Sequence, residues 1–392
     1  MKITKLKIEG VGGIESLELT PNPHMNILCG PNGIGKTTVL EVISHGFANG
    51  QSNVLKRHVN SPASRIQLDY EIDGTAASHQ LTFDTFAPGK PTPISGMHQQ
   101  SSGILSLKTT RTFQYRALEA IGKDPAKENR ILWNEAMLGI NLNDVKNWFV
   151  NRFLFSHVPN GLSKELLANY QLAKQCFDEL EPGFSFATVE ASSHEIMVNA
   201  PTGLIYYEYL SSGFKSIISI LFGIIKEVEY RFTDPRIAAA DFGGIILIDE
   251  LDLHLHPAWQ TRIAGILSKT FPKAQFFATT HSPHIIQGAP PNEIIALGRV
   301  DDKVIQRQLP DSTYGFQGWS IDEVLTDVMG MKDTRTGIYQ DAMAAFQTAV
   351  DYDAYTDAKE AFAELDRLLH PSSHMRKLLA FQLAGITADS DG

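Results

Sequence analysis

A glycine-rich stretch between an apolar run and a helix-forming run constrains this chain more than any other feature. The apolar run Met25–Cys29 reads as a strand, and Val39–Ile43 reads as the first turns of a helix. Between them stand Gly30, Pro31, Asn32, Gly33, Ile34, Gly35, Lys36, Thr37 and Thr38. Strand, turn and helix frame the pattern G-x-x-x-x-G-K-[ST] of a phosphate-binding P-loop. The alternative, a glycine-rich surface turn, is disfavoured by the strand and the helix on either side.

The residue types in this stretch indicate how it binds phosphate. Glycines let the backbone curl so that successive N–H groups point at one phosphate chain, and the following helix adds the positive end of its dipole. We expect Lys36 to reach the β- and γ-phosphates and the Thr37 hydroxyl to ligate Mg²⁺. The stretch therefore predicts a site for a nucleoside triphosphate with Mg²⁺.

A second strand ends in two acidic residues. Ile245–Ile248 is a continuous apolar run, as expected for a central parallel strand covered on both faces, and Asp249 and Glu250 follow it. Carboxylates at the carboxyl end of such a strand lie where open α/β sheets bind ligands. We expect Asp249 to hold Mg²⁺ and Glu250 to polarise the attacking water. The alternative is that two acids simply begin a loop.

Two further motifs extend the candidate site. Leu210, Ser211, Ser212 and Gly213 stand at the start of a helix expected over Gly213–Phe232, where serine and glycine can also serve as a plain N-cap. Thr279–Pro283 follows a second apolar run, Ala274–Ala278, and contains His281. A lone histidine at a strand end is usually structural, but one beside a P-loop can sense a γ-phosphate.

Composition and charge exclude some classes of protein. The 392 residues carry a net charge of −10, which argues against wholesale coating of nucleic acid but leaves room for a local basic groove. Cys29 and Cys176 cannot form a disulfide framework, which favours a reducing compartment. The longest apolar run, Ile217–Ile225, is too short to span a bilayer. We therefore expect a cytoplasmic protein without a membrane segment.

The pattern along the chain predicts that parts containing both strands and helices alternate with purely helical parts. Strands are expected in the first part of the chain and again after residue 184, and residues 87–103 are expected to form an exposed loop because Pro, Gly, Ser and Gln dominate there. Helical periodicity dominates residues 115–121, 125–138, 143–155 and 164–180, and again residues 320–386.

The order of these motifs resembles a known family. P-loop, helical insertion, L-S-x-G, apolar-D-E and strand-H are similar to the ATP-binding-cassette (ABC) ATPases, and more closely to the branch with RecF, Rad50, SMC and OLD-type ATPases. Leu251–Pro257 (L-D-L-H-L-H-P) and Thr279–Pro283 are typical of the OLD-like group. The tail from Trp319 onward, Arg111–Tyr115 and Lys146–Arg152 resemble stand-alone ATPases of the PtuA type, from anti-phage operons such as Septu and the retrons.

The resemblance implies an α/β fold of the P-loop NTPase class and ABC-ATPase type, with a mixed, largely parallel sheet and antiparallel N-terminal strands. It implies a helical lobe insertion and a C-terminal helical domain. The expected boundaries are residues 1–112 for the first part of the ATPase core, 113–183 for the lobe, 184–310 for the second part of the core, and 311–392 for the C-terminal domain.

The resemblance also implies a head-to-tail dimer that holds two ATP molecules with Mg²⁺. The stretch Gly30–Thr38 of one subunit would bind ATP, and Ser211 and Gly213 of the other would cover its γ-phosphate. Asp252 would lie in the D-loop, His281 would be the switch histidine, and Gln114 is the candidate for a glutamine that touches Mg²⁺. Departures from the family pattern at Ser212 and Phe214 weaken the assignment of the signature contacts.

The functional prediction is an ATPase that signals its nucleotide state to a separately encoded effector, expected to be a nuclease, in anti-phage defence. The insertion is too short for a Rad50 or SMC coiled coil, and no acidic set indicates a nuclease within this chain. Two alternatives stay open. One is a RecF-like repair ATPase that binds DNA directly, and the other is a nucleotide-dependent assembly scaffold with slow turnover.

Overall fold

The structure, a computed structural model, describes residues 1–110, 115, 117–301, 303–331 and 335–389. The chain divides into two compact units, Met1–Met331 and Lys332–Gly392. Residues 311–331, which the sequence grouped with the C-terminal helices, lie in the first unit.

Six strands form the central sheet of the first unit, in the order β15-β14-β3-β13-β12-β8. Their bounds are Met25–Cys29 (β3), Ile104–Leu107 (β8), Ile245–Ile248 (β12), Gln275–Thr279 (β13), Ile294–Val300 (β14) and Lys303–Gln306 (β15). Neighbours pair in parallel except β14 and β15, which pair antiparallel. The carboxyl ends of β3, β13 and β12 therefore lie side by side at one edge of the sheet. This parallel α/β arrangement confirms the predicted fold class.

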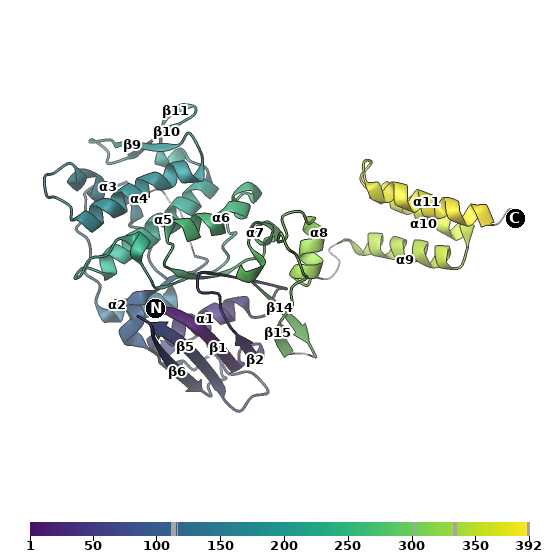
Figure 1. Cartoon of the computed structure of the whole chain (residues 1–392), viewed down its shortest axis with the longest axis horizontal. Coiled ribbons are helices and arrows are strands. Elements are labelled where there is room, and N and C mark those ends of the chain that lie inside the picture. The colour runs from purple at the N-terminus through teal and green to yellow at the C-terminus, as the bar shows by residue number, and fades with distance from the viewer. Residues whose placement is uncertain (111–114, 116, 302, 332–334, 390–392) are drawn as a thin grey trace. The chain divides into compact units, whose positions relative to one another are not determined.

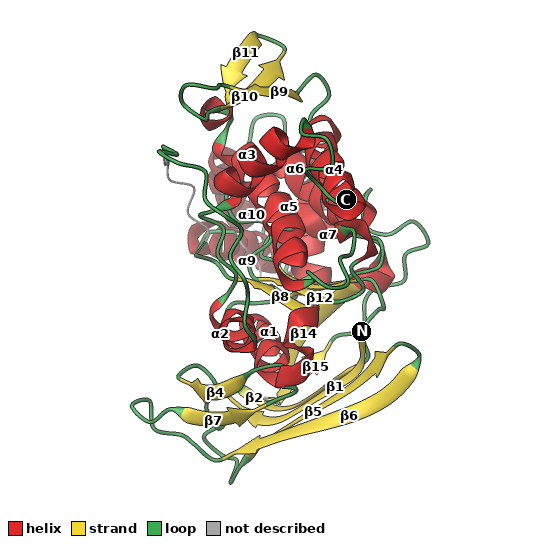
Figure 2. Cartoon of the chain, turned by 90° about the vertical axis from the view of Figure 1, so that its left-hand side faces the viewer, coloured by secondary structure: helices red, strands yellow, loops and turns green. Residues whose placement is uncertain are grey.

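Alternation along the central strands creates two apolar cores. Ile245 and Leu247 of β12 point into a core with helix α1 (Lys36–Gly46) and the antiparallel strands, whereas Ile246 and Ile248 point into a core with the lobe helices. Successive side chains of a strand face opposite sides, so a continuous apolar run is what a strand covered on both faces requires. Figure 2 shows α1 between the central sheet and the antiparallel sheet.

The antiparallel sheet has the order β2-β1-β5-β6. Its strands are Lys2–Val11 (β1), Ile14–Leu19 (β2), Ser64–Ile72 (β5) and Thr75–Phe83 (β6). A separate pair joins β4 (Asn49–Ser52) to β7 (Thr92–Ser95). The prediction of an exposed loop over residues 87–103 was wrong in part, because Thr92, Ile94 and Met97 are buried. Thr92 and Ile94 lie in β7, which pairs with the short strand β4, and β4 has no apolar alternation of its own.

Helices cover the other face of the central sheet (Figure 1). They are α3 (Val145–Ser156), α4 (Lys164–Leu180), α5 (Ser212–Arg231), α6 (Pro257–Thr270) and α7 (Pro283–Gly288). Helix α2 (Asn129–Leu138) lies instead beside α1, and its Ala136 belongs to the core on that side (Figure 2). A small sheet of β9 (Ser185–Val189), β10 (Ile196–Ala200) and β11 (Gly203–Tyr206) lies at the far end of the lobe. The predicted helix over residues 115–121 is absent from residues 117–121, and the next helix starts only at Asn129. Tertiary contacts of Asp124 and Lys127 replace helix there.

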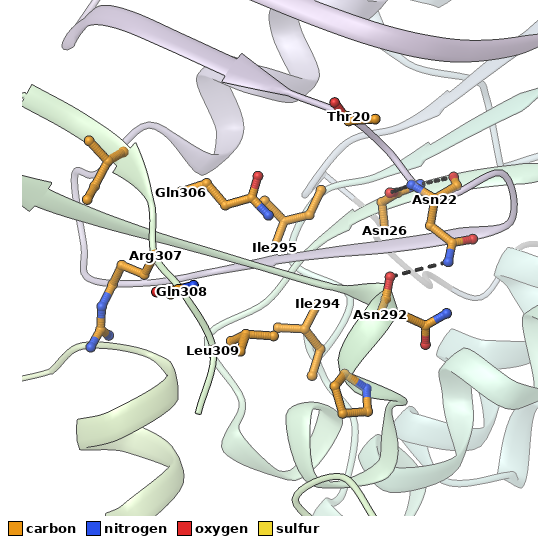
Figure 3. Close-up of a pocket in the computed structure, with 12 residues that line it drawn as sticks. Thr20, Asn22, Asn26, Asn292, Ile294, Ile295, Gln306, Arg307, Gln308 and Leu309 are labelled. Atoms are coloured by element: carbon orange, nitrogen blue, oxygen red, sulfur yellow. Dashed lines mark hydrogen bonds between the residues drawn. The ribbon is translucent and has the colours of Figure 1, made fainter. Parts of the chain in front are cut away.

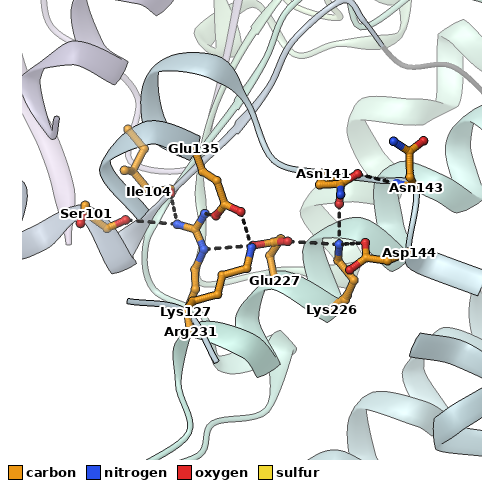
Figure 4. Close-up of polar contacts among 10 residues, drawn as sticks. All are labelled: Ser101, Ile104, Lys127, Glu135, Asn141, Asn143, Asp144, Lys226, Glu227 and Arg231. Carbon is orange, nitrogen blue, oxygen red and sulfur yellow. Dashed lines mark hydrogen bonds and ion pairs between the residues drawn. The ribbon is translucent and has the colours of Figure 1, made fainter. Parts of the chain in front are cut away.

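A cluster of charged residues joins the C-terminal half of α5 to neighbouring segments (Figure 4). Glu227 lies at its centre, with carboxylate oxygens 2.5 Å from the Lys127 ammonium and 3.2 Å from both Lys226 Nζ and Arg231 Nε. Arg231 also donates to the carbonyl oxygens of Ser101 and Ile104, at the start of β8. We call this set the lobe charge cluster; it comprises Lys127, Glu135, Asp144, Lys226, Glu227 and Arg231.

The last helical segment of the first unit begins with a capping box. Ser320 and Glu323 exchange side-chain and backbone hydrogen bonds at the start of α8 (Ile321–Glu323), which continues as a π-helix over Val324–Val328. Phe316, Val324 and Val328 belong to the same core as the lobe helices.

The second unit contains α9 (Gly337–Asp351), α10 (Tyr355–Leu368) and α11 (His374–Asp389). These helices bury an apolar cluster of their own, which includes Phe346, Ala358 and Leu365. Nowhere in the two units' described residues does a helix have the length and apolar character needed to cross a membrane.

Candidate nucleotide-binding site

The sheet order brings the predicted P-loop and the predicted acidic strand together. The Thr37 hydroxyl, at the start of α1, donates to Asp249 Oδ1 across 3.0 Å. Thr279, the last residue of β13, donates to the same oxygen across 2.6 Å. The start of α1 and the ends of β12 and β13, which are far apart in the sequence, therefore converge on one carboxylate.

Backbone geometry accounts for two glycines of the loop. A Cβ atom at Gly30 would lie 2.4 Å from the carbonyl oxygen of Leu297, so the neighbouring strand leaves no space for a side chain. Gly35 has φ 106°, which an L-residue rarely adopts, and it is the residue from which α1 starts. No side chain caps this helix end, so its first N–H groups are not satisfied by a cap.

Lys36 lies inside the loop. Its ammonium donates to the carbonyl oxygens of Gly30 at 2.9 Å and Pro31 at 3.1 Å, and the residue is only 5% exposed. Burial lowers the pKa of Lys36, while the nearby Asp249 acts in the opposite direction. The ammonium of Lys36 is thus held by neutral backbone groups of the glycine-rich turn.

Glu250 follows Asp249 in a left-handed backbone conformation with φ 50°. Its N–H donates to the Thr279 hydroxyl across 2.7 Å, so the same side chain supports both acids. A left-handed conformation costs energy for a residue with a side chain, and such strain is found most often at functional sites. The structure therefore places Glu250 at the sheet edge beside Asp249, in a conformation that the surroundings impose.

Asp252 holds the segment that carries the predicted switch histidine. Its Oδ1 atom accepts hydrogen bonds from the Thr280 hydroxyl at 2.6 Å and from the His281 N–H at 3.1 Å. The side chain of His281 is exposed at the same sheet edge. The next residue, Ser282, donates to Gln260 Oε1 on α6 across 2.6 Å.

Ser211 and Gly213 lie at the first turn of α5. The Ser211 hydroxyl accepts from the N–H of Phe214, so the N-cap that the sequence offered as the plain alternative is present. Gly213 packs beneath Trp259 of α6. Within the described residues, no hydrogen bond joins Ser211 or Gly213 to Gly30–Thr38 of the same chain. The structure of one chain thus does not bring these two motifs together.

Sequence reasoning missed a pocket of about 540 Å³ beside the P-loop helix. Gly12, in the turn between β1 and β2, lines this pocket, and a Cβ atom there would lie 3.6 Å from Thr38 Cγ2. Arg57 also lines it, with its guanidinium 4.9 Å from the centre of the Phe86 ring. Nothing in the sequence pairs these three segments, because the tertiary fold alone brings them together. The candidate Gln114 lies outside the described residues.

A second open pocket, of about 670 Å³, lies at the opposite end of β3 from the P-loop (Figure 3). Asn22 and Asn26 already have partners there: the Asn22 N–H donates to Asn26 Oδ1 at 2.7 Å, and Asn22 Nδ2 donates to the carbonyl oxygen of Asn292 at 3.2 Å. We assign no ligand to this pocket.

Comparison with known proteins identifies the relatives of this chain. Residues 148–287 match the family described as "AAA domain, putative AbiEii toxin, Type IV TA system", and residues 5–157 match another described as "AAA domain". The Septu protein PtuA of Bacillus thuringiensis is 43% identical over 387 residues, which cover 97% of this chain and 98% of the relative.

More distant relatives match smaller shares. The Septu protein PtuA of Bacillus mycoides (strain KBAB4) is 24% identical over 85% of this chain and 45% of its own length. The Retron Ec83 probable ATPase of Escherichia coli is 36% identical over 26% of this chain and 19% of its own length. Among solved structures, the SMC head domain from Thermotoga maritima has a TM-score of 0.47 and 12% identity, over 79% of this chain and 100% of that domain.

Proposed function

Because the chain belongs to the family of the Septu protein PtuA, we propose that it is an ATPase that binds ATP with Mg²⁺ and hydrolyses it. The observation that carries the proposal is the hydrogen bond between the Thr37 hydroxyl and Asp249, because these side chains come from two motifs that are 212 residues apart. Both offer oxygen ligands, which Mg²⁺ prefers, so the residues fit this ion. Bound there, Mg²⁺ would neutralise charge that develops on the phosphates.

The other residues take the remaining roles. Gly30–Thr38 cradle the phosphates with backbone N–H groups, and Lys36 exchanges its carbonyl partners for phosphate oxygens. Glu250 accepts a proton from the attacking water or polarises it, and His281 contacts the γ-phosphate. The pocket lined by Gly12, Arg57 and Phe86 receives the base and ribose, since it adjoins the first turn of α1.

Two substitutions separate binding from turnover. Glu250→Gln should keep ATP affinity and lower the hydrolysis rate by about 10²–10⁴-fold, because an amide is a poor proton acceptor. Lys36→Ala should weaken ATP binding by about tenfold or more, because it removes a charged hydrogen bond to phosphate. The measurements are ATP affinity and steady-state phosphate release for each variant. Normal turnover in Glu250→Gln would contradict the assignment.

We also propose that each ATP-binding site is completed by Ser211 and Gly213 of a second subunit, arranged head-to-tail with the first. The first turn of α5 has an exposed serine and forms no hydrogen bond with the P-loop of its own chain within the described residues, which a site shared between two chains explains. Ser211→Arg should then abolish hydrolysis while ATP binding persists.

Mixing Ser211→Arg with Lys36→Ala at equal ratio tests the shared site directly. Half of the dimers are then mixed, and each mixed dimer has one complete site, so about a quarter of the wild-type activity should return. Absence of recovery over a range of ratios would argue against the head-to-tail arrangement.

The biological output proposed for this ATPase is control of a separately encoded effector, a nuclease, in anti-phage defence. The family membership supports this context, and the chain's own chemistry supports the ATPase role. Co-purification from the native host, with and without Glu250→Gln, tests the effector: a nuclease should accompany the variant that retains ATP. A preparation that binds and cleaves DNA without any partner would favour the alternative of direct action on nucleic acid.

A further inference from the structure

We propose that Trp259 is a positioning residue that transmits the state of a subunit's own catalytic segment to its own signature turn. By signature turn we mean Leu210–Gly213. The inference rests on the proposed function, because in a head-to-tail dimer the signature turn of one subunit covers the ATP bound by the other. Trp259 would thereby couple the two ATP sites.

The contact between Trp259 and the signature turn is closer than ordinary packing allows for a side chain. A Cβ atom at Gly213 would lie 2.7 Å from Trp259 Cζ3 and 3.0 Å from Cε3. The indole ring also meets the Phe214 ring edge-on, with centroids 5.8 Å apart. Gly213 is therefore required here by the indole above it, and a shift of Trp259 must move or release the first turn of α5.

A short, rigid segment connects this contact to Glu250. The carbonyl oxygen of Glu250 accepts from the Leu253 N–H at 3.0 Å, and that of Asp252 accepts from the Leu255 N–H at 3.0 Å. His254, in the middle, has φ 65°, and its carbonyl oxygen would lie 3.1 Å from a Cβ at Gly213. Two tight turns thus lead directly from the catalytic acid to the signature turn.

A second connection comes from the switch-histidine segment. Gln260, the neighbour of Trp259 on α6, accepts from the Ser282 hydroxyl and donates to the carbonyl oxygen of Leu255 at 2.9 Å. Ser282 directly follows His281. The first turn of α6 is therefore tied both to the residue proposed to contact the γ-phosphate and to the segment that follows Glu250.

These contacts give a specific direction to the coupling. Trp259 touches the signature turn of its own chain, which serves the partner's ATP. Removing the indole should therefore damage the site built on the partner's P-loop and leave the site on its own P-loop intact. Coupling free energies between sites typically change affinities or populations by about 5–150-fold, so the effect is measurable.

The experiment mixes Trp259→Ala with two inactive variants and measures ATP hydrolysis. With Glu250→Gln, the mixed dimer keeps one site with an intact catalytic acid and an intact signature turn, so about a quarter of the wild-type rate should return. With Ser211→Arg, both sites of the mixed dimer are defective, and no rate should return beyond the residual rate of Trp259→Ala. Trp259→Ala alone should bind ATP but hydrolyse it at least about fivefold more slowly.

Control variants separate coupling from a general loss of packing. Trp259→Phe keeps an aromatic ring over Gly213 and should retain most of the activity. Trp259→Leu fills more space than alanine and should show the same mixing pattern, which keeps the test available if Trp259→Ala does not fold. Trp133→Ala removes a half-buried tryptophan that packs on His98 instead, and should show no preference between the two mixing partners.

Four results would overturn the inference: full activity of Trp259→Ala, recovery only with Ser211→Arg, equal recovery with both partners, or recovery with neither while the pair Lys36→Ala and Ser211→Arg recovers. Failure of that last pair has a different meaning. It would contradict the head-to-tail dimer itself, which is the premise on which the coupling depends.

Discussion

Two groups of charged residues in the first unit are held in different ways. In the lobe charge cluster, three cations and three carboxylates pair with one another, and Glu227 and Arg231 have fully buried side chains. At the candidate site, Lys36 is held by backbone carbonyls and Asp249 by two hydroxyls, and within the described ranges these two residues form no ion pair.

The difference is between charges that neutralise one another and charges that neutral groups hold. Opposite charges that neutralise each other away from water are costly to separate, so the lobe charge cluster fixes α5 against α2 and β8. Neutral partners bind a charge less strongly and can be exchanged for phosphate or Mg²⁺. The stability of the first unit should therefore depend on regions away from the site, and activity should depend on the site.

The largest expected loss of stability comes from a truncation that removes the end of the first unit. Truncation after Gly318 deletes Val324, Val328 and Met329, which are buried in the lobe core, and should cost about 5–9 kcal/mol of unfolding free energy. Truncation after Met331 removes only residues outside the first unit and should leave its stability and its ATP binding unchanged. Chemical denaturation of both truncated proteins, with ATP affinity measured in parallel, decides the matter. If the protein truncated after Gly318 were stable and bound ATP, the stability of the first unit would not depend on this region away from the site.

The next test removes one charge from each group. Glu227→Gln leaves the three surrounding cations undercompensated and should lower the unfolding free energy by about 3–5 kcal/mol. Lys36→Ala should change it by less than about 1 kcal/mol while weakening ATP binding. Lys5→Ala, which breaks an exposed pair with Glu18, is the matched control and should leave the unfolding free energy almost unchanged. Equal losses in Glu227→Gln and Lys36→Ala would show that the two groups do not differ.

Acidification should produce a loss of stability that is spread over several pH units. Burial lowers the pKa of His45, on α1, from 6.5 to about 4, so the folded state keeps it neutral between Glu41 and Ser52. Its stabilising contribution is present above pH 6.5 and is lost as the pH falls toward 4, by up to about 1.4 kcal/mol per pH unit. Unfolding measured against pH should show this loss, and His45→Gln should remove it. His24→Gln, at an exposed position, should not.

The lobe charge cluster responds in a lower pH window. Burial opposes ionisation of Glu227, but its three cations prevail and lower its pKa from 4.5 to about 2. Its contribution is present above pH 4.5 and is lost between pH 4.5 and 2, and Glu227→Gln should not show that loss. A wild-type curve that is flat between pH 6.5 and 4.5 but falls below it would leave Glu227 as the acid-sensitive group and exclude His45.

Much of the candidate site was predictable because its motifs are local. A P-loop needs a strand, a glycine-rich turn and a helix in immediate succession, so Gly30–Thr38 identifies itself within a few residues. The acids after Ile245–Ile248 are equally local, and the apolar run predicts a strand covered on both faces. The convergence of Thr37 and Asp249 then followed from the rule that parallel strands end at one edge of a sheet.

Other parts depended on partners that no local pattern specifies. Residues 117–121 have helix-forming composition but are not helical. The segment of β7 was predicted to be part of an exposed loop because Pro, Gly, Ser and Gln dominate residues 87–103, and no local pattern indicates its pairing with β4. The pocket of Gly12, Arg57 and Phe86 joins three segments that carry no shared motif. Each of these features results from contacts between residues that are distant in the sequence, which propensity does not encode.

The amino-acid sequence by itself determined the local elements of the candidate site: the glycine-rich stretch between a strand and a helix, the acids that follow the second strand, and which strands are central. These depend on residue type and spacing over a few positions, where backbone geometry and hydrophobic periodicity act directly. Only the tertiary structure decided how the parts act on one another. The indole of Trp259 over Gly213 and the pairing of Glu227 with Lys127 both span more than forty residues, and packing in three dimensions selects such contacts.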